Sequence, residues 1–526
     1  MYSKLIKIVA VIICCHNIAF SQAPKEKVTL KEGSETEYQK DFGLDYLGRD
    51  AQGNKVFYQT YLKSVSLGST RYDIENSLLL YNDQLSRTGE KEIVWPEEQS
   101  MRYISWNEAF NAESFQINGE YYLARSFHIE KTKELILNIY KYDPARNKLE
   151  LYKKITEIPD DKYINWDNYF TIIASPDSSK WLFYKYYEKP KSKGQEGLFC
   201  IMTDNNFNIL WKKEMDIPIE NGLSDFIDDC VSNDGSAHFL FEEYMSVKTA
   251  KEEGARSYMN LFTLKNATSA PLRSKMSLEF SFEITECRIE TTPKGIIFGG
   301  YFQGVRKLSV GPILRRESDR KGFFIDYFPE TGTHQPTHFM DITDKDLTIA
   351  GPIMVVEPIV LVQYLLPDGH GGYYITGEKY WETGGGASNS IVKGHNADIF
   401  AVHFDEELNP GWKQSSPKYC SPGYTEGKFN YCFIRPEGLC CLYDVNEDEK
   451  INPIGANMDN KALFLAQIDL KTGQLAKTKL LPHSVYKGYR TNFGNFVTED
   501  NKLYFLGVDW NLGKGKLKLR ELTFGN

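Results

Sequence analysis

Three absences in this sequence exclude large classes of protein. Beyond a short N-terminal apolar run, no segment approaches the about 20 apolar residues that a membrane-spanning helix needs. Basic residues are not in excess, because the chain has 62 Lys and Arg against 71 Asp and Glu and a net charge of -9. The sequence also contains no basic stripe that could attract a phosphate backbone. Neither a G-x-S-x-G nucleophile elbow nor an H-E-x-x-H zinc motif is present. The sequence therefore predicts no integral membrane span, no nucleic-acid partner and neither of these two hydrolase types.

The N-terminal residues have the layout of a cleaved secretory signal. Two lysines precede an apolar run over residues 8–15, and small residues stand at positions 19 and 21. We expect residues 1–21 to be removed as a signal peptide. A lipoprotein is the less favoured alternative, because neither Cys14 nor Cys15 follows a lipidation box. The mature chain is expected to be exported, either periplasmic or secreted.

Cysteine is scarce in the mature chain. Several of the remaining cysteines lie in apolar, strand-like runs such as "GLFCIMTD" and "GLCCLYD", where a free cysteine behaves as a small buried hydrophobe. We favour that interpretation over a disulfide framework, because a chain of this length can bury a core without cross-links. The number is odd, so at least one thiol is free or bonds outside the chain. The mature cysteines are Cys200, Cys230, Cys287, Cys420, Cys432, Cys440 and Cys441.

Tight turns and aromatic residues are abundant, and one corner recurs along the chain. In "SPDSSKWLFYKYY" (residues 175–187) a polar turn precedes an apolar run with the alternation of a strand. Similar corners read "AQGNKVFYQTYL", "INGEYYLARSF", "SNDGSAHFLFEEY", "TPKGIIFGGYF", "LPDGHGGYYITGEKYW", "RPEGLCCLYDV" and "TEDNKLYFLGVDW". Their turns lie at positions 53, 118, 178, 235, 294, 370, 437 and 500, with a mean spacing of about 64 residues.

Each period predicts four antiparallel strands. One strand precedes the corner, one follows it, and two more flank a second polar turn, as in "GLFCIMTDNNFNILWKKEMDIP". Four-stranded units at a fixed period, with almost no helical pattern between them, are typical of a β-propeller. The sequence therefore predicts an all-β chain with a single propeller domain over residues 22–526. The blades are expected to start near residues 41, 101, 166, 223, 281, 358, 426 and 489.

The two chain ends are predicted to complete one blade together. The eighth repeat contains only three strands before Asn526, and "EKVTLKEG" (residues 26–33) belongs to no complete repeat. We expect the segment 22–40 to supply the missing outer strand, which hides two open sheet edges. A seven-bladed ring with an additional sheet is the alternative.

The corners "SPDSSK" and "LPDG" before a strand resemble the repeats of TolB-like and related extracytoplasmic β-propellers. The resemblance extends over nearly the whole mature chain and implies the fold. It implies no site residues, because the period here is long and no strict repeat consensus is present.

Candidate ligand contacts lie in the connections between blades. In a propeller, the loops from fourth to first strands and from second to third strands share one face around the channel mouth. The parallel stretches "ISWNEAF" and "INWDNYF" place a tryptophan followed by polar residues at equivalent positions of neighbouring blades. An indole can stack on a sugar ring and donate one hydrogen bond; packing between blades is the alternative role. The candidates are Trp106, Asn107, Glu108, Trp166, Asp167 and Asn168, with Tyr424, Tyr489 and Arg490 in the matching region of other blades.

Catalytic and metal signatures are weak. "DVNEDEKINPIG", from Asp444, lacks the glycine and the final carboxylate of a calcium loop, and we interpret it as a solvated acidic loop. No metal site and no cofactor are expected. The sequence favours an exported binding or scaffold protein that recognises a protein partner or a glycan at the channel mouth. The alternative is a carbohydrate-active enzyme, similar to a polysaccharide lyase, at the same mouth.

Overall fold

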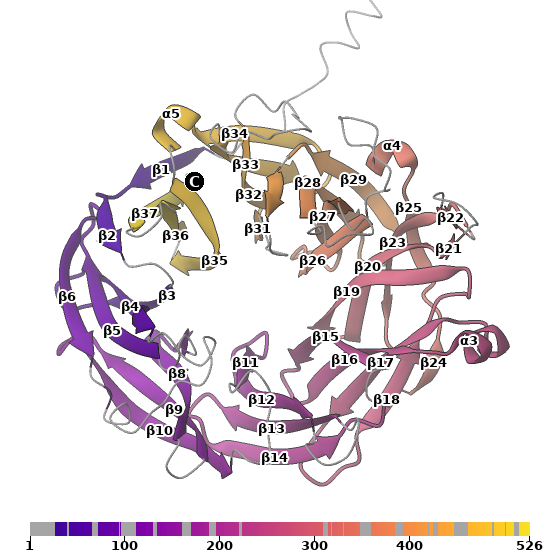
Figure 1. Cartoon of the computed structure of the whole chain (residues 1–526), viewed down its shortest axis with the longest axis horizontal. Coiled ribbons are helices and arrows are strands. Elements are labelled where there is room, and N and C mark those ends of the chain that lie inside the picture. Colours follow the sequence, from indigo (N-terminus) through magenta and orange to yellow (C-terminus); the bar gives the residue numbers. More distant parts are fainter. Residues whose placement is uncertain are drawn as a thin grey trace, which may run out of the picture.

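A computed structural model gives the fold as a ring of eight antiparallel blades, an eight-bladed β-propeller (Figure 1). The prediction of an all-β propeller with eight blades is confirmed, and the seven-bladed alternative is wrong. The structure describes residues 27–38, 42–65, 72–93, 95, 112–129, 134–159, 170–188, 196–219, 224–308, 314–316, 318–329, 331–347, 359–383, 393–418, 420–423, 430–446, 461–486, 489–499, 501–509 and 515–525.

Within each blade the strands follow one another from the ring axis outwards. Blade 1 contains β3 (Phe42–Arg49), β4 (Lys55–Val65), β5 (Tyr72–Tyr81) and β6 (Arg87–Ile93), and blade 2 contains β7 (Ala112–Ile117), β8 (Glu120–Ile129), β9 (Glu134–Asp143) and β10 (Lys148–Pro159). Blade 3 contains β11 (Thr171–Ala174), β12 (Lys180–Glu188), β13 (Glu196–Asp204) and β14 (Ile209–Asp216), and blade 4 contains β15 (Ser224–Val231), β16 (Ala237–Tyr244), β17 (Ser257–Leu264) and β18 (Leu272–Met276).

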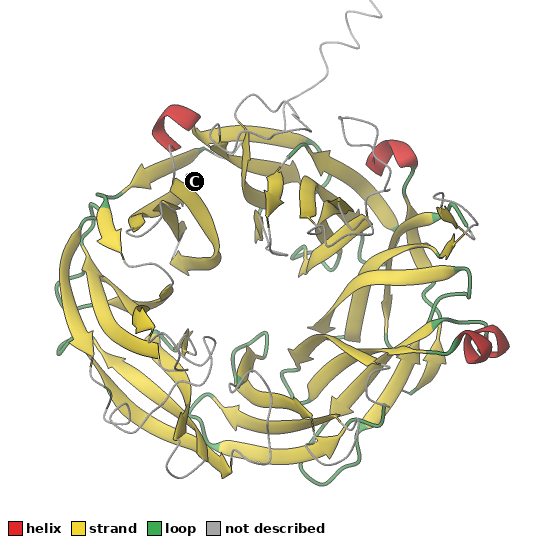
Figure 2. Ribbon diagram, viewed as in Figure 1, coloured by secondary structure: helices red, strands yellow, loops and turns green. Residues whose placement is uncertain are grey.

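The second half of the ring repeats this plan with small additions. Blade 5 contains β19 (Phe282–Thr292), β20 (Gly295–Gly304), β23 (Lys321–Tyr327) and β25 (His338–Asp341), and blade 6 contains β26 (Ile359–Pro367), β27 (Tyr373–Thr383), β28 (Lys393–Phe404) and β29 (Pro410–Ser416). Blade 7 contains β31 (Asn430–Arg435), β32 (Gly438–Asn446), β33 (Lys461–Asp469) and β34 (Leu475–Leu481), and blade 8 contains β35 (Tyr489–Glu499), β36 (Lys502–Asp509) and β37 (Gly515–Phe524). The additions are β21 (Arg306–Leu308), β22 (Leu314–Arg316), β24 (Gly332–His334), β30 (Cys420–Gly423) and the short helices α3 (Val247–Glu253), α4 (Asp344–Leu347) and α5 (His483–Tyr486), which Figure 2 shows at the rim.

The N-terminal segment closes the ring, as the sequence predicts. β1 (Val28–Glu32) pairs antiparallel with β37, so that Val28 lies opposite Phe524 and Glu32 opposite Arg520. β2 (Thr36–Tyr38) then pairs with the beginning of the same strand. Val28 and Leu30 pack against the apolar core between blades 7 and 8. Pairing the two ends of the chain therefore leaves β37 without an open edge, which a terminal blade would otherwise expose.

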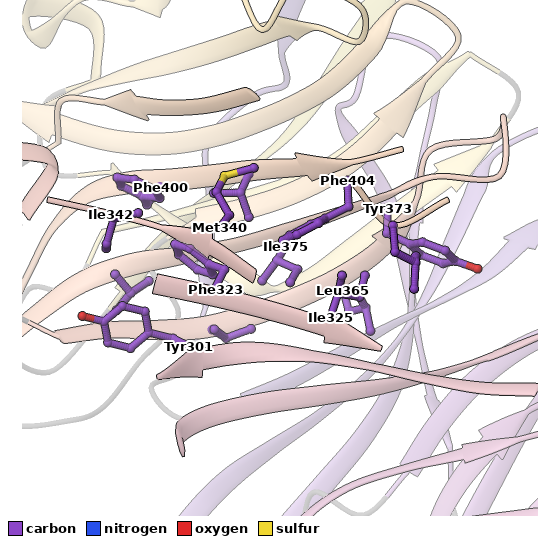
Figure 3. Close-up of a cluster of buried hydrophobic side chains, with 14 of the residues drawn as sticks. Tyr301, Phe323, Ile325, Met340, Ile342, Leu365, Tyr373, Ile375, Phe400 and Phe404 are labelled. Atoms are coloured by element: carbon purple, nitrogen blue, oxygen red, sulfur yellow. The ribbon is translucent and has the colours of Figure 1, made fainter. Parts of the chain in front are cut away.

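Apolar side chains from facing blades interlock to form the core. Between blades 5 and 6, for example, the rings of Phe323 and Phe400 stack with their centroids 5.5 Å apart. Figure 3 shows this cluster, with Ile325, Leu365 and Ile375 between the two sheets. Because each sheet buries both faces against its neighbours, the second strands read as continuous apolar runs.

The hairpins between third and fourth strands add a recurring apolar contact. Leu85, Phe207 and Leu408 occupy the same place in the hairpins of blades 1, 3 and 6, with positive φ angles of 61°, 57° and 62°. Each side chain is almost fully buried and packs against the preceding blade. An Asp or Asn three residues earlier accepts backbone hydrogen bonds and holds the turn, as Asp204 does from the amides of Asn206 and Asn208.

Lysines on the outer strands of blades 1, 2 and 3 each bind the hairpin of the following blade. The Lys91 ammonium of blade 1 donates to the carbonyls of Arg146 and Asn147 in blade 2, at 3.1 and 2.9 Å. Lys153 of blade 2 donates to the side-chain oxygen of Asn208 in blade 3 at 2.9 Å, and Lys213 of blade 3 donates to the carbonyl of Ala267 in blade 4 at 3.3 Å. Lysine on an edge strand also discourages pairing with another sheet, so these side chains serve two structural purposes.

Candidate functional site

Most of the predicted ligand contacts lie outside the described residues. These are Trp106, Asn107, Glu108, Trp166, Asp167, Asn168 and Tyr424. Tyr489 and Arg490 are described in their backbone and begin β35, opposite Asp509 and Val508 of β36. They therefore stand where the chain enters the innermost strand of blade 8, on the face to which the sequence assigns the mouth.

The two faces of the ring differ in the length of their connections. Every connection from a first to a second strand has only two to five residues. On the other face, connections extend from Ile93 to Ala112, from Gly304 to Lys321 and from Asp341 to Ile359. Such insertions on one rim of a rigid scaffold are where recognition usually lies. The corner in "SPDSSKWLFYKYY" belongs to the short-turn face, between β11 and β12, where the carboxylate of Asp177 accepts from the amide of Ser179 at 2.9 Å.

The strands nearest the ring axis carry more acidic than basic residues. The acidic residues are Asp45, Glu113, Asp225, Asp228, Asp229, Glu283, Glu286, Glu290 and Glu499, and the basic ones are Arg49, Arg288, Arg435 and Arg490. The excess is concentrated in blades 2, 4 and 5. No local sequence motif indicates this excess, because the residues are far apart in the chain and come together only when the first strands of all repeats are aligned.

Two of these carboxylates satisfy backbone amides on the inner edge of the following blade. The carboxylate of Asp45 in β3 accepts from the amide of Ser114 in β7 at 3.4 Å. Asp228 in β15 accepts from the amide of Ile289 in β19 at 2.8 Å. Innermost strands lack a neighbour on their axial side, so these bonds compensate amides that the sheet cannot pair. This part of the acidic lining therefore has a structural purpose.

The environment near the axis also changes the acidity of the carboxyl groups. Burial raises the pKa of Asp45 to about 7. Burial and the neighbouring Asp45 together raise the pKa of Glu113 to about 7, and burial raises the pKa of Asp229 to about 7. A carboxyl group with such a pKa can donate or accept a proton near neutrality, which an acid or base catalyst requires and which a structural group can also show.

These shifts predict a contribution to the stability of the ring that is lost as the pH rises. The folded chain holds the Asp45 proton more tightly than the unfolded chain, so the contribution of Asp45 to the free energy of unfolding should fall between about pH 4 and about pH 7 and level off above it. Asp45→Asn removes this titration and keeps an oxygen acceptor for Ser114. For that variant we expect the free energy of unfolding to fall less than it does for the wild type between about pH 4 and about pH 7. Urea unfolding followed by tryptophan fluorescence at several pH values measures this difference. The exposed Asp319→Asn should retain the wild-type slope, and equal slopes for Asp45→Asn and wild type would contradict the assignment.

The expectation of a solvated acidic loop at Asp444 is wrong for that residue. Asp444 lies within β32 and is 4 % exposed. Its carboxylate accepts from the amide of Thr491, at 3.3 Å, and the same amide donates to the hydroxyl oxygen of Tyr486 at 2.8 Å. Burial raises the pKa of Tyr486 far above its usual value, with the charge of Asp444 acting in the same direction. Asp444 therefore joins blades 7 and 8.

A second buried polar network joins blades 6 and 7. The ammonium of Lys418 donates to Oε1 of Glu378 at 2.5 Å, and both side chains have zero exposure. The amide of Asn430, the first residue of β31, donates to the same oxygen and to Oε1 of Gln363, the latter at 2.6 Å. Oε2 of Glu378 has no hydrogen-bond partner among the described residues. Sequence patterns give no indication of this network, because its members come from four separate segments.

No group of three or more His, Cys, Asp or Glu side chains within the described residues could hold a metal ion. None of the helices assigned in the described ranges has the length and apolar character to cross a membrane.

Comparisons with known proteins give no family. No family model matches the chain, so the resemblance to TolB-like repeats has no support at the level of a family, and no curated protein matches it. Among solved structures, polysaccharide lyase Uly1 aligns with 10 % identity over 94 % of this chain and 100 % of its own, with a TM-score of 0.38. The WD40 domain of SCAP from fission yeast gives 10 % identity, 95 % and 98 % coverage and a TM-score of 0.37. The α-L-arabinanase of Penicillium chrysogenum gives 10 % identity, 65 % and 94 % coverage and a TM-score of 0.30. Similarities this weak carry no argument about function, and the chain's own strand pairing identifies the propeller.

Proposed function

We propose that this chain is an exported binding or scaffold protein. Its ligand, a protein partner or a glycan, would lie over the face that carries the long connections between second and third strands and between blades. The observation that supports this is the asymmetry of the ring, with tight turns of two to five residues between all first and second strands and insertions on the opposite rim. Repeat scaffolds commonly carry recognition on such insertions. The proposed location of the protein is the periplasm or the cell exterior.

The ligand contacts that we propose are the tryptophans of two neighbouring inter-blade connections. Trp106 is followed by Asn107 and Glu108, and Trp166 is followed by Asp167 and Asn168. Each set combines a flat apolar surface with hydrogen-bonding groups, which suits a sugar ring or an exposed peptide segment. The proposal therefore depends on two repeated sets rather than on one residue.

Charge makes the polysaccharide lyase alternative the weaker of the two. A lyase that acts on an anionic polysaccharide has to neutralise a sugar carboxylate, usually with Arg, Lys or a metal ion. The innermost strands, as far as they are described, carry nine acidic but only four basic residues, so they supply few cations for that role. We therefore propose binding without catalysis.

A binding assay with paired variants tests the proposal. We expect the mature protein to retain a defined set of ligands on a glycan array or in a pull-down from the envelope fraction of its own organism. Trp106→Ala with Trp166→Ala should weaken that capture at least tenfold, because stacking on an aromatic ring contributes on the order of 1 kcal/mol or more for each contact. This double variant should keep the circular dichroism spectrum and the unfolding midpoint of the wild type.

The matched control lies on the opposite face. Lys294 and Lys471 are exposed residues of the short hairpins, and Lys294→Ala with Lys471→Ala should leave capture unchanged. Equal loss in both double variants, or unchanged capture in the tryptophan variant, would move the site away from the long-connection face. Release of unsaturated products from anionic polysaccharides would instead restore the lyase alternative.

A further inference from the structure

Two of the cysteines face one another inside blade 7. Cys432 of β31 and Cys441 of β32 lie directly opposite in the strand register. Their Sγ atoms are 2.9 Å apart, and both residues are buried, at 4 % and 0 % exposure. The adjacent Cys440 lies opposite Phe433 instead, so it points to the other face of the sheet. The two strands therefore select one thiol pair from three neighbouring cysteines.

The hairpin register favours a covalent bond between these sulfurs. β31 and β32 are joined by a two-residue turn, and their register runs without a bulge from Arg435 opposite Gly438. Hydrogen-bonded and non-bonded pairs alternate outwards from the closing pair, which places Cys432 and Cys441 in a non-bonded pair. Such pairs have Cα atoms about 4.5 Å apart, within the range that disulfides occupy. The backbone can therefore accept the bond without rearrangement.

We propose that Cys432 and Cys441 form a disulfide in the exported protein. One thiolate attacks an oxidising disulfide, such as an oxidised thiol–disulfide oxidoreductase or glutathione disulfide, and forms a mixed disulfide. The second thiolate then displaces the oxidant as a thiol. The two cysteines lose two protons and two electrons, and the oxidant's disulfide is reduced to two thiol groups, on one oxidoreductase or on two glutathione molecules. Because both sulfurs are buried in the finished ring, the bond forms before blade 7 packs against blade 6.

The bond would fasten the innermost strand of blade 7 beside a buried polar network. Cys432 Sγ lies 3.3 Å from Oδ1 of Asn430, two residues earlier on the same face of β31. Asn430 in turn donates to Glu378 and Gln363 of blade 6. A disulfide would hold β31 against β32 and would remove the thiol hydrogen that can bind Asn430. We therefore expect its effect on stability to be felt mainly where Asn430 joins blade 7 to blade 6. Seven cysteines are expected in the mature chain, so at least one thiol outside this pair cannot bond within the chain.

Peptide mapping under non-reducing conditions tests the proposal. The mature chain is produced in an oxidising compartment, alkylated with N-ethylmaleimide in denaturant and cleaved after glutamate. Cleavage after Glu437 separates fragment 427–437, which holds Cys432, from fragment 438–447, which holds Cys440 and Cys441. We expect the two fragments to stay linked until a reductant is added, and the reduced chain to unfold at a lower temperature than the oxidised chain.

Three variants identify the partner sulfur. Cys441→Ser and Cys432→Ser should each release the fragments and label one additional thiol, whereas Cys440→Ser should leave them linked. Quantitative alkylation of Cys432 in chain that has folded under oxidising conditions would overturn the proposal. Linkage that persists in Cys441→Ser and disappears in Cys440→Ser would overturn it as well, because it would assign the bond to the other face.

Discussion

Replacing Glu32 by alanine should lower the free energy of unfolding by about 3–5 kcal/mol, although the residue lies in a short N-terminal strand. The guanidinium of Arg520 has zero exposure, and its Nε donates to Oε1 of Glu32 at 3.0 Å. Neither terminal nitrogen of Arg520 has a hydrogen-bond partner among the described residues. Glu32→Ala would therefore leave a buried cation without its carboxylate.

The same change would weaken the closure of the ring. Glu32 and Arg520 are opposite residues of β1 and β37, the two strands that join the chain ends. The ring of Tyr486 lies 5.0 Å from the Arg520 guanidinium, and a side chain at Gly507 would collide with it. The surroundings are thus built to hold the guanidinium in place, so the chain cannot easily move it into water. We expect the variant to expose the edge of β37 and to form aggregates at concentrations where the wild type stays monodisperse.

Urea unfolding and size-exclusion chromatography measure these two effects. Glu35→Ala is the matched control. Glu35 pairs with Lys516, which lies in β37 as Arg520 does, but both side chains of this pair are more than two-fifths exposed. An exposed pair contributes at most about 1 kcal/mol, so this control should behave nearly as the wild type. Glu32→Gln retains an acceptor and should lie between the two. If Glu32→Ala is as stable as Glu35→Ala, the pair does not secure the closure.

The architecture was predictable from sequence because its determinants are local and repeated. A turn residue followed by alternating apolar positions marks each hairpin, and eight such corners define the blades. Even the closure followed from counting, since the last repeat lacks a strand and residues 26–33 belong to no other. The apolar residues at positive φ were not predictable, because Leu85 and Phe207 need a backbone conformation that their residue type disfavours. Packing against the preceding blade stabilises them there, and such contacts are invisible to local patterns.

The candidate site was much less predictable. A carboxylate close to the axis, such as Asp45, looks like any polar strand residue until its distant neighbour Glu113 is placed beside it. For Asp444 the expectation was wrong in the opposite direction. The acidic stretch that begins with Asp444 predicts exposure to solvent, whereas the fold buries Asp444. In both cases the property depends on which blades meet, and the sequence of one repeat does not contain that information.

Replacing Lys418 by methionine should destabilise the joint between blades 6 and 7 by about 3–5 kcal/mol. Lys418 and Glu378 are both fully buried, and their ammonium and carboxylate are 2.5 Å apart. Methionine has a similar volume, so the loss would come from the uncompensated carboxylate and not from a cavity. Asn430 still donates to Glu378, but one neutral amide cannot balance a buried charge.

A second substitution separates charge from packing in this joint. Lys418→Met combined with Glu378→Gln removes both charges and keeps an oxygen acceptor for Asn430, so it should recover most of the lost stability in urea unfolding. Lys413→Met is the matched control, since Lys413 pairs with Asp346 at 2.7 Å near the surface and should contribute no more than about 1 kcal/mol. A double variant no more stable than Lys418→Met would mean that the lysine acts through packing. In the charge-based case, the buried pair contributes little net stability and instead makes any other pairing of blades 6 and 7 unfavourable, because a mispaired blade would bury one of these charges alone.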